Sequence, residues 1–319
     1  MNITTTQKGD PDPSISFRYR WLAWASFIGM FLVLIAGAIV TKTGSGRGCG
    51  DDWPLCNGKF IPAYTLESII EYSHRMVTGI VGLIILATFI YTWRYLRQYR
   101  EAVGYAGGTL FFTVVQAFMG AAAVIWPQRP AVMAIHFGIS LLAVASSMLL
   151  VVWTYRMKKT KEDAVPIRFP KAVYLLAWGI WIYCYGVVYL GAYIRHTHSD
   201  AGCMGWPLCN GQVIPTLSGA SGIVFLHRVA AAVLLILIVC LYLLIRRHDS
   251  GEQALSLNHV AGLALLFVMA QVFSGAWLTL TMNNADIYIF TSLLHNVLAT
   301  LLFSALTDIS IRSWKFRAR

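Results

Sequence analysis

Long apolar stretches of the sequence contain four histidines: His74, His136, His227 and His295. Burying an imidazole there is unfavourable unless a partner satisfies its ring nitrogens. Two neutral imidazoles that face each other are good axial ligands for haem iron, and the porphyrin supplies the apolar bulk around them. Zinc is the weaker interpretation, because no third and fourth ligands occur at the level of these histidines. The residue types therefore predict haem-sized pockets built on histidine pairs.

One carboxylate accompanies the first histidine. Glu71 lies three residues before His74 in the segment IIEYSHR, so the two side chains share one face of a helix. A carboxylate beside a haem edge can exchange protons or stabilise a cationic carbon, which would distinguish a reaction site from an electron-transfer site. The simpler interpretation is a structural carboxylate that pairs with Arg75 or with a loop charge.

The composition places these residues in an integral membrane protein. Of the 319 residues, 57% are hydrophobic and 12% are charged, whereas soluble domains average roughly 25% charged residues. The net charge of +11 does not indicate nucleic-acid binding, because the basic residues are scattered in short loops. Eight apolar segments are long enough to cross a bilayer as helices. They lie near 20–41, 67–94, 104–126, 131–156, 171–194, 221–246, 256–281 and 287–312.

Lysine and arginine positions predict the orientation of these helices. Most of them fall in the tail and loops that share a side with the N-terminus, and few fall in the opposite loops. By the positive-inside rule both termini are cytoplasmic. Residues 1–19 are expected to form a disordered tail. The first apolar run is too long for the core of a signal peptide, so it is expected to remain as a membrane anchor.

The chain contains two copies of one four-helix unit. Residues 37–58, GAIVTKTGSGRGCGDDWPLCNG, align with residues 191–211, GAYIRHTHSDAGCMGWPLCNG, and QAFMGAAAVI aligns with QVFSGAWLTL further along each copy. The repeat predicts two tandem four-helix bundles, 20–160 and 161–319, related by a pseudo-two-fold axis along the membrane normal.

The repeat pairs the histidines and exposes one difference between the copies. Each even-numbered predicted helix carries one of the four histidines, about 8–12 Å from the outer end at 1.5 Å per residue. His74 aligns with His227, but Val224 stands where the first copy has Glu71. Because two copies that only bound and reduced haem would not need a carboxylate in one alone, the first half is predicted to be the place of chemistry.

Arginines and further histidines leave alternatives open. Arg75 and Arg228 directly follow a histidine in each copy. Contact with haem propionates and extension to lipid headgroups account for them equally well. The remaining histidines fall in loops or at helix ends and are expected to be solvated or interfacial; they are His196, His198, His248 and His259.

Two cysteine pairs fall in loops on the outer side, where disulfides persist. They are Cys49 with Cys56 and Cys203 with Cys209. Each pair would close a tight loop over one haem pocket. The first interpretation is a structural staple, and the second is a redox role close to the active site.

These residues resemble the haem A synthase family over nearly the whole chain, from about residue 20 to 312. The matching motifs are EYSHR, HFGIS (136–140), LHR (226–228), LLHN (293–296) and the duplicated WPLCNG loops. The outer-loop cysteine pairs resemble those of bacterial members of the Gram-positive type. The resemblance therefore implies a multi-pass protein of the bacterial cell membrane, with its cysteine loops on the outer face.

The resemblance implies an oxidoreductase that converts haem O to haem A for terminal oxidases, by oxidising the C8 methyl to a formyl group. It implies that His74 and His136 hold the substrate haem O, that His227 and His295 ligate haem b, and that Glu71 lies at the reactive edge. The hypothesis for the reaction is a two-stage oxidation through an alcohol and an aldehyde hydrate. Expected partners are haem O, membrane lipid, haem O synthase and terminal oxidase assembly factors.

Other protein classes share parts of the pattern. A di-haem b-type membrane cytochrome that transfers electrons from quinol would have the same four histidines, but it would not need Glu71. A transporter is less favoured, because the helices contain no pair broken by Gly or Pro at matching midplane positions. A thiol–disulfide relay would explain the cysteines but not the histidines.

Overall fold

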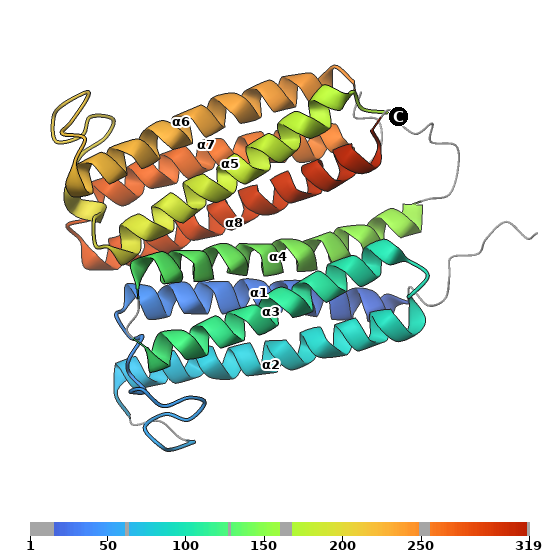
Figure 1. Cartoon of the computed structure of the whole chain (residues 1–319), viewed down its shortest axis with the longest axis horizontal. Coiled ribbons are helices and arrows are strands. Elements are labelled where there is room, and N and C mark those ends of the chain that lie inside the picture. The colour runs from blue at the N-terminus through green and yellow to red at the C-terminus, as the bar shows by residue number, and fades with distance from the viewer. Residues whose placement is uncertain (1–15, 61–63, 127–128, 160–167, 249–255, 318–319) are drawn as a thin grey trace, which may run out of the picture.

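The computed structural model describes residues 16–60, 64–126, 129–159, 168–248 and 256–317. Figure 1 shows long helices throughout: α1 (Phe17–Lys42), α2 (Leu66–Tyr95), α3 (Arg100–Ile125), α4 (Pro130–Lys159), α5 (Lys171–His196), α6 (Gly219–Arg246), α7 (Leu257–Leu280) and α8 (Ala285–Lys315). All eight are long and apolar enough to cross a membrane. Extended structure within the described ranges is limited to isolated β-bridges. The predicted all-α membrane architecture is confirmed.

The helices begin and end within a few residues of the predicted positions. The first helix begins at Phe17 rather than at residue 20, because the Ser16 hydroxyl accepts the Tyr19 N–H and caps the first turn. Thr65 and Asn284 cap α2 and α8 in the same way. The end of the segment 1–19, predicted as a tail, is therefore helical, and residues 1–15 lie outside the described residues.

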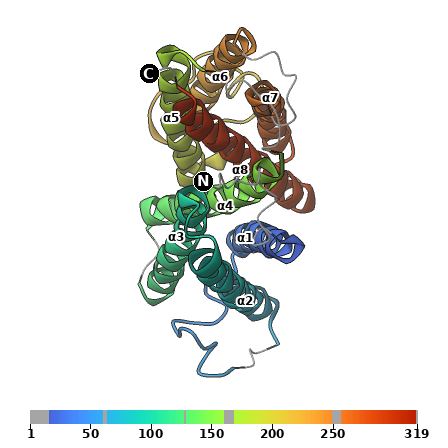
Figure 2. The ribbon, with the colours of Figure 1, turned by 90° about the vertical axis from the view of Figure 1, so that its right-hand side faces the viewer.

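The helices of the two halves lie side by side. Figure 1 shows α1 to α4 grouped together and α5 to α8 grouped together. In Figure 2, α4 and α8 lie in the middle of the molecule. The first half meets the second where α4 packs on α5 and α8, and where α1 packs on α8. The pseudo-two-fold relation between the halves stays a prediction.

A buried apolar cluster continues from one half into the other. It includes Leu141 of α4, Cys184 of α5 and Phe303 of α8, none of which is measurably exposed. In contrast, the outer faces of other helices expose large apolar side chains, which suits contact with lipid. Examples are Ile80, Phe118, Ile236 and Leu266. The interface between the halves is thus part of the core, and it fixes the position of the cavity described below.

The two cysteine loops lie at the same end of the bundle. In Figure 1 the loop between α1 and α2 and the loop between α5 and α6 are at the end opposite the start of α1 and the end of α8. The loop between α5 and α6 includes a short 3-10 helix, η1 (Asp200–Gly202). Which end of the bundle faces the cytoplasm stays a prediction.

Candidate functional site

The four histidines lie on the even-numbered helices α2, α4, α6 and α8, and all of them line one cavity. The cavity has a volume of about 1280 Å³ and is lined by residues of both halves. The sequence predicts one pocket per half. In the structure, the two histidine pairs share a single continuous cavity that crosses the interface between the halves.

Three of the histidines are free to ligate iron, because no hydrogen bond within the described residues engages Nε2 of His74, His136 or His227. Nδ1 is buried without a hydrogen-bond partner in His74, His136 and His227. The His227 ring lies near the Val187 carbonyl but makes no hydrogen bond of normal geometry with it. Buried polar atoms are rarely left unpaired. Imidazoles that protein groups leave unsatisfied, in a mostly apolar cavity, are suited to an iron porphyrin.

His295 is held more firmly than the other three histidines. Its Nδ1 lies 2.8 Å from the Ser274 hydroxyl oxygen, and its Nε2 lies 2.9 Å from the Gln271 side-chain nitrogen. In the first half the aligned glutamine, Gln116, bonds the main-chain carbonyl of His136 at 2.5 Å instead of its ring. In a histidine that ligates a metal, the hydrogen bond made by the other ring nitrogen fixes the tautomer and the orientation of the ring. The second-half pair therefore has a support that the first-half pair lacks.

Glu71 lies at the junction between the cavity and the first cysteine loop. Its side chain is almost fully buried and lines the cavity. Oε1 accepts a hydrogen bond from Arg75 Nη2 at 2.5 Å, and Oε2 accepts one from the Cys49 N–H at 2.9 Å. Such charge-assisted bonds hold a carboxylate in one orientation. The structural pairing with Arg75 is therefore present, and it leaves Glu71 beside the cavity.

The two arginines fasten the cysteine loops to the histidine-bearing helices. Arg75 donates to the Leu55 carbonyl at 2.6 Å, and Arg228 donates to the Cys203 carbonyl at 2.8 Å. Both guanidinium groups are engaged by the loops, a role that the sequence did not indicate. Disulfides close both loops, as predicted; they join Cys49 to Cys56 and Cys203 to Cys209.

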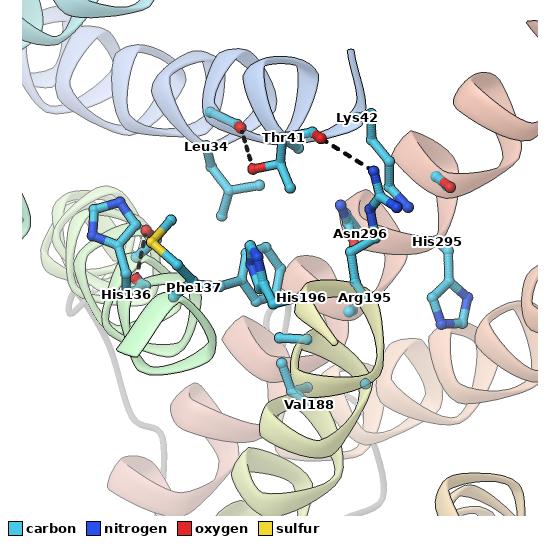
Figure 3. A pocket seen from close by; sticks show the side chains of 18 of the residues that line it. Leu34, Thr41, Lys42, His136, Phe137, Val188, Arg195, His196, His295 and Asn296 are labelled. Atoms are coloured by element: carbon cyan, nitrogen blue, oxygen red, sulfur yellow. Dashed lines mark hydrogen bonds between the residues drawn. The ribbon is translucent and has the colours of Figure 1, made fainter. Parts of the chain in front are cut away.

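A polar cluster lies in the cavity, and Figure 3 shows two of its members, Lys42 and Arg195, in the region between His136 and His295. Arg195 donates to the Thr41 carbonyl at 3.1 Å and lies 4.0 Å from the Asp200 carboxylate, which also accepts the Tyr288 hydroxyl. The Lys42 ammonium lies 4.8 Å from the centroid of the Tyr288 ring. Lys42 forms no ion pair with any residue in the described part of the chain. The cluster thus presents more positive than negative charge to the cavity.

His196 belongs to the same region, although it was expected to be solvated or interfacial. It is the last residue of α5, is only half-buried, and lines the cavity (Figure 3). Lys42, the last residue of α1, occupies the aligned position in the first copy. Each half therefore places polar side chains from the end of its first helix in the shared cavity: Thr41 and Lys42 from α1, and Arg195 and His196 from α5.

A family model matches the chain over residues 20–307. The matching family is COX15-CtaA, described as cytochrome oxidase assembly protein. The chain belongs to this family. The likeness therefore covers all eight helices, although α8 continues to Lys315, and the family resemblance found in the sequence is confirmed.

Curated relatives in the family are similar over most of their length. A heme A synthase of Halalkalibacterium halodurans is 40% identical over 280 residues, which are 88% of this chain and 91% of that protein. A heme A synthase of Geobacillus kaustophilus is 39% identical over 292 residues, 90% of this chain and 91% of that protein. A third heme A synthase, from Alkalihalophilus pseudofirmus, is 37% identical over 281 residues, which are 88% of this chain and 92% of that protein.

The structure adds residues that the sequence pattern did not single out in this COX15-CtaA member. Ser274 was part of an aligned motif, but only the fold brings its hydroxyl to the His295 ring. Lys42 and Arg195 come from different halves and approach through the packing of α1 on α8 and of α4 on α5. The repeat places Lys42 and Arg195 at the ends of equivalent helices, but it does not show that the two halves bring these ends into one cavity.

Proposed function

We propose that this chain is a haem A synthase, an oxidoreductase that converts the C8 methyl of haem O to the formyl group of haem A. The observation that carries the proposal is similarity, over 90% of the chain, to a relative named heme A synthase. The two histidine pairs and Glu71 on one cavity support it, because they provide two haem sites with a carboxylate at only one of them.

We place haem O between His74 and His136, and haem b between His227 and His295. Ser274 supports this placement, because an outer hydrogen bond strengthens a histidine ligand, and a resident cofactor benefits from a firm ligand. Met119 occupies the aligned position in the first half and offers only a weakly accepting thioether. A weaker hold suits a substrate that must leave as product.

Glu71 is proposed to handle protons at the reacting methyl group. Haem b, when bound, supplies one-electron chemistry. The Glu71 carboxylate, oriented by Arg75 and by the Cys49 N–H, can accept protons as the methyl is oxidised to an alcohol and then to an aldehyde hydrate. It can also stabilise positive charge that develops on the methylene carbon. Val224 at the aligned position can do neither.

The polar cluster is proposed to receive haem propionates. Carboxylates in an apolar cavity need cationic partners, and Lys42 has no ion-pair partner among described residues, while the buried Nε of Arg195 has no hydrogen bond. We favour Lys42 over Arg75 and Arg228, because both arginines are engaged by loop carbonyls and Lys42 is not.

Replacing Lys42 by glutamine is expected to weaken retention of the second-half haem about tenfold, by loss of one charge-assisted contact. Its midpoint potential should also fall, because a nearby cation favours the reduced iron. Redox titration and haem loss from the purified protein measure both effects. Lys59→Gln in the exposed first cysteine loop is the control. Equal behaviour of the two variants would remove Lys42 from the propionate site.

A Cys49→Ser, Cys56→Ser double variant is expected to lower haem A formation several-fold. The loop it loosens supplies the N–H that orients Glu71, so the carboxylate would lose a fixed position. The matched control is Cys203→Ser, Cys209→Ser, whose loop faces Val224 rather than a carboxylate. Normal turnover in the first variant would leave the Cys49–Cys56 bond without a part in catalysis.

The test of the proposed function is the formation of haem A. The full chain is co-expressed with a haem O source, and haems are extracted from the purified protein with acid acetone and separated by chromatography. Haem A in the extract supports the proposal. Its absence, with two b-type haems retained, would favour the alternative of a di-haem cytochrome that transfers electrons from quinol.

We expect a bacterial cell membrane protein with cytoplasmic termini and with its cysteine loops on the outer face. Haem O synthase would supply the substrate, and terminal oxidase assembly factors would take the product. Membrane lipid would surround the exposed apolar faces, and no nucleic-acid partner is expected.

A further inference from the structure

Each of the four cavity histidines presents its ring carbon Cε1 to a glycine on a neighbouring helix. The pairs are Gly37 with His74, Gly120 with His136, Gly191 with His227 and Gly275 with His295. Gly37 and Gly191 lie on α1 and α5, and Gly120 and Gly275 lie on α3 and α7. In the internal repeat, Gly37 aligns with Gly191 and Gly120 aligns with Gly275. The glycine contact is therefore a feature of all four ligand positions.

The four contacts are not equally close. A methyl group added at Gly191 would lie 3.0 Å from Cε1 of His227, and one at Gly275 would lie 3.2 Å from Cε1 of His295. Carbon atoms prefer separations of about 3.5–4.0 Å, so both rings would have to move. At Gly37 the distance to His74 is 3.3 Å, which is also tight. At Gly120 the distance to His136 is 3.8 Å, so a methyl group fits there.

We propose that Gly191 and Gly275 are positioning residues that fix both imidazoles of the second-half pair, whereas His136 is left with room to move. In the first half only His74 is closely packed, against Gly37. The inference rests on the proposed function, in which the second-half haem stays and the first-half haem is exchanged. We further infer that the first-half haem is exchanged when its iron is released from His136.

Hydrogen bonds support the same difference between the halves. Ser274 bonds Nδ1 of the His295 ring and holds the ring in place, which leaves Nε2 to ligate iron once the Gln271 amide withdraws from it. The His136 ring is bonded on neither nitrogen within the described residues, and its Nδ1 is buried without a partner. Gln116 and the Ser140 hydroxyl hold only the main-chain carbonyl of His136. The helix is therefore fixed at this position while the ring is not, which allows the ligand bond to open without movement of α4.

The test compares two aligned substitutions, Gly275→Ala and Gly120→Ala, in the full chain purified with both haems. The readouts are the low-spin ferric EPR signal of each haem, which reports imidazole orientation, and the rate of haem transfer to an apo-globin acceptor. His74→Ala and His227→Ala identify which signal belongs to which half. We expect Gly275→Ala to shift the second-half signal and to speed loss of that haem about tenfold. Gly120→Ala should change neither signal.

Gly104→Ala on α3 and Gly186→Ala on α5 are the controls, because the added methyl group meets no atom within 4 Å at either position. Like the test variants, these controls replace glycine by alanine and so raise helix propensity, but the added methyl group contacts no histidine ring. The inference is overturned if Gly120→Ala disturbs its haem as much as Gly275→Ala does, if Gly275→Ala changes nothing, or if both haems change together. The EPR signal and the rate of haem loss can be measured without turnover. Failure to form haem A would therefore refute the proposed function, but it would not decide whether Gly191 and Gly275 position the histidine rings.

Discussion

Replacing Glu71 by glutamine is expected to stop haem A formation while both haems remain bound. Glutamine has nearly the same shape and can still accept the Cys49 N–H. It cannot take a proton from the substrate, and it loses the ion pair with Arg75. Loss of a positioned general base lowers rates by about 10²–10⁴-fold. The ratio of haem A to haem O, extracted from the purified variant, measures the effect.

Two comparisons separate proton handling by Glu71 from its structural role. Glu67→Gln changes an exposed carboxylate in the first turn of the same helix and should leave the ratio unchanged. Arg75→Gln removes the ion pair but keeps the carboxylate, so it should retain more activity than Glu71→Gln. A Glu71→Gln protein that makes haem A at the normal rate would end the catalytic assignment. Equal loss in Glu71→Gln and Arg75→Gln would reduce Glu71 to an anchor of the loop.

The helices could be predicted from sequence because length and apolar composition alone decide whether a segment can cross a bilayer. The ends were less certain, because a cap such as Ser16 acts through one hydrogen bond that composition does not contain. The histidine pairs were predictable for a different reason. The internal repeat aligned His74 with His227, and that alignment separated the shared histidine from the unshared Glu71.

The surroundings of the histidines could not be predicted, because they depend on contacts between distant segments. Arg75 reaches the Leu55 carbonyl only because the cysteine loop folds back over α2. His196 is near a helix end in sequence, which suggested solvent, but the packing of α5 on α4 places it in the cavity. The close contacts of Gly191 and Gly275 were equally hidden, since glycine is common in membrane helices for many reasons.

The structural differences between the halves point in one direction. The second half has Ser274 on a ligand ring and two tight glycine contacts. The first half has Glu71 beside the cavity and a loosely held His136. Firm ligands suit a haem that stays, and a loose ligand beside a carboxylate suits a haem that reacts and leaves. A duplicated haem-binding unit could reach this division of roles through a few substitutions, without a change of fold.

Removing one histidine from each pair is expected to remove different haems. His227→Ala should lose haem b and retain haem O, and it should make no haem A because the resident redox partner is missing. His74→Ala should keep haem b and lose the substrate. A bis-imidazole haem loses an axial ligand in either case, so total haem should fall to about half. Acid-acetone extraction with chromatography, beside the optical spectrum, distinguishes the two outcomes.

The control for both variants is His248→Ala, an exposed histidine beyond the end of α6, which should keep both haems and full activity. The opposite pattern, in which His227→Ala loses haem O and His74→Ala loses haem b, would exchange the two sites and leave Glu71 beside the resident cofactor. Loss of both haems from each variant would mean that the shared cavity binds them only as a pair. Selective loss is expected instead, because each pair of imidazoles lies on helices of a single half, α2 with α4 and α6 with α8.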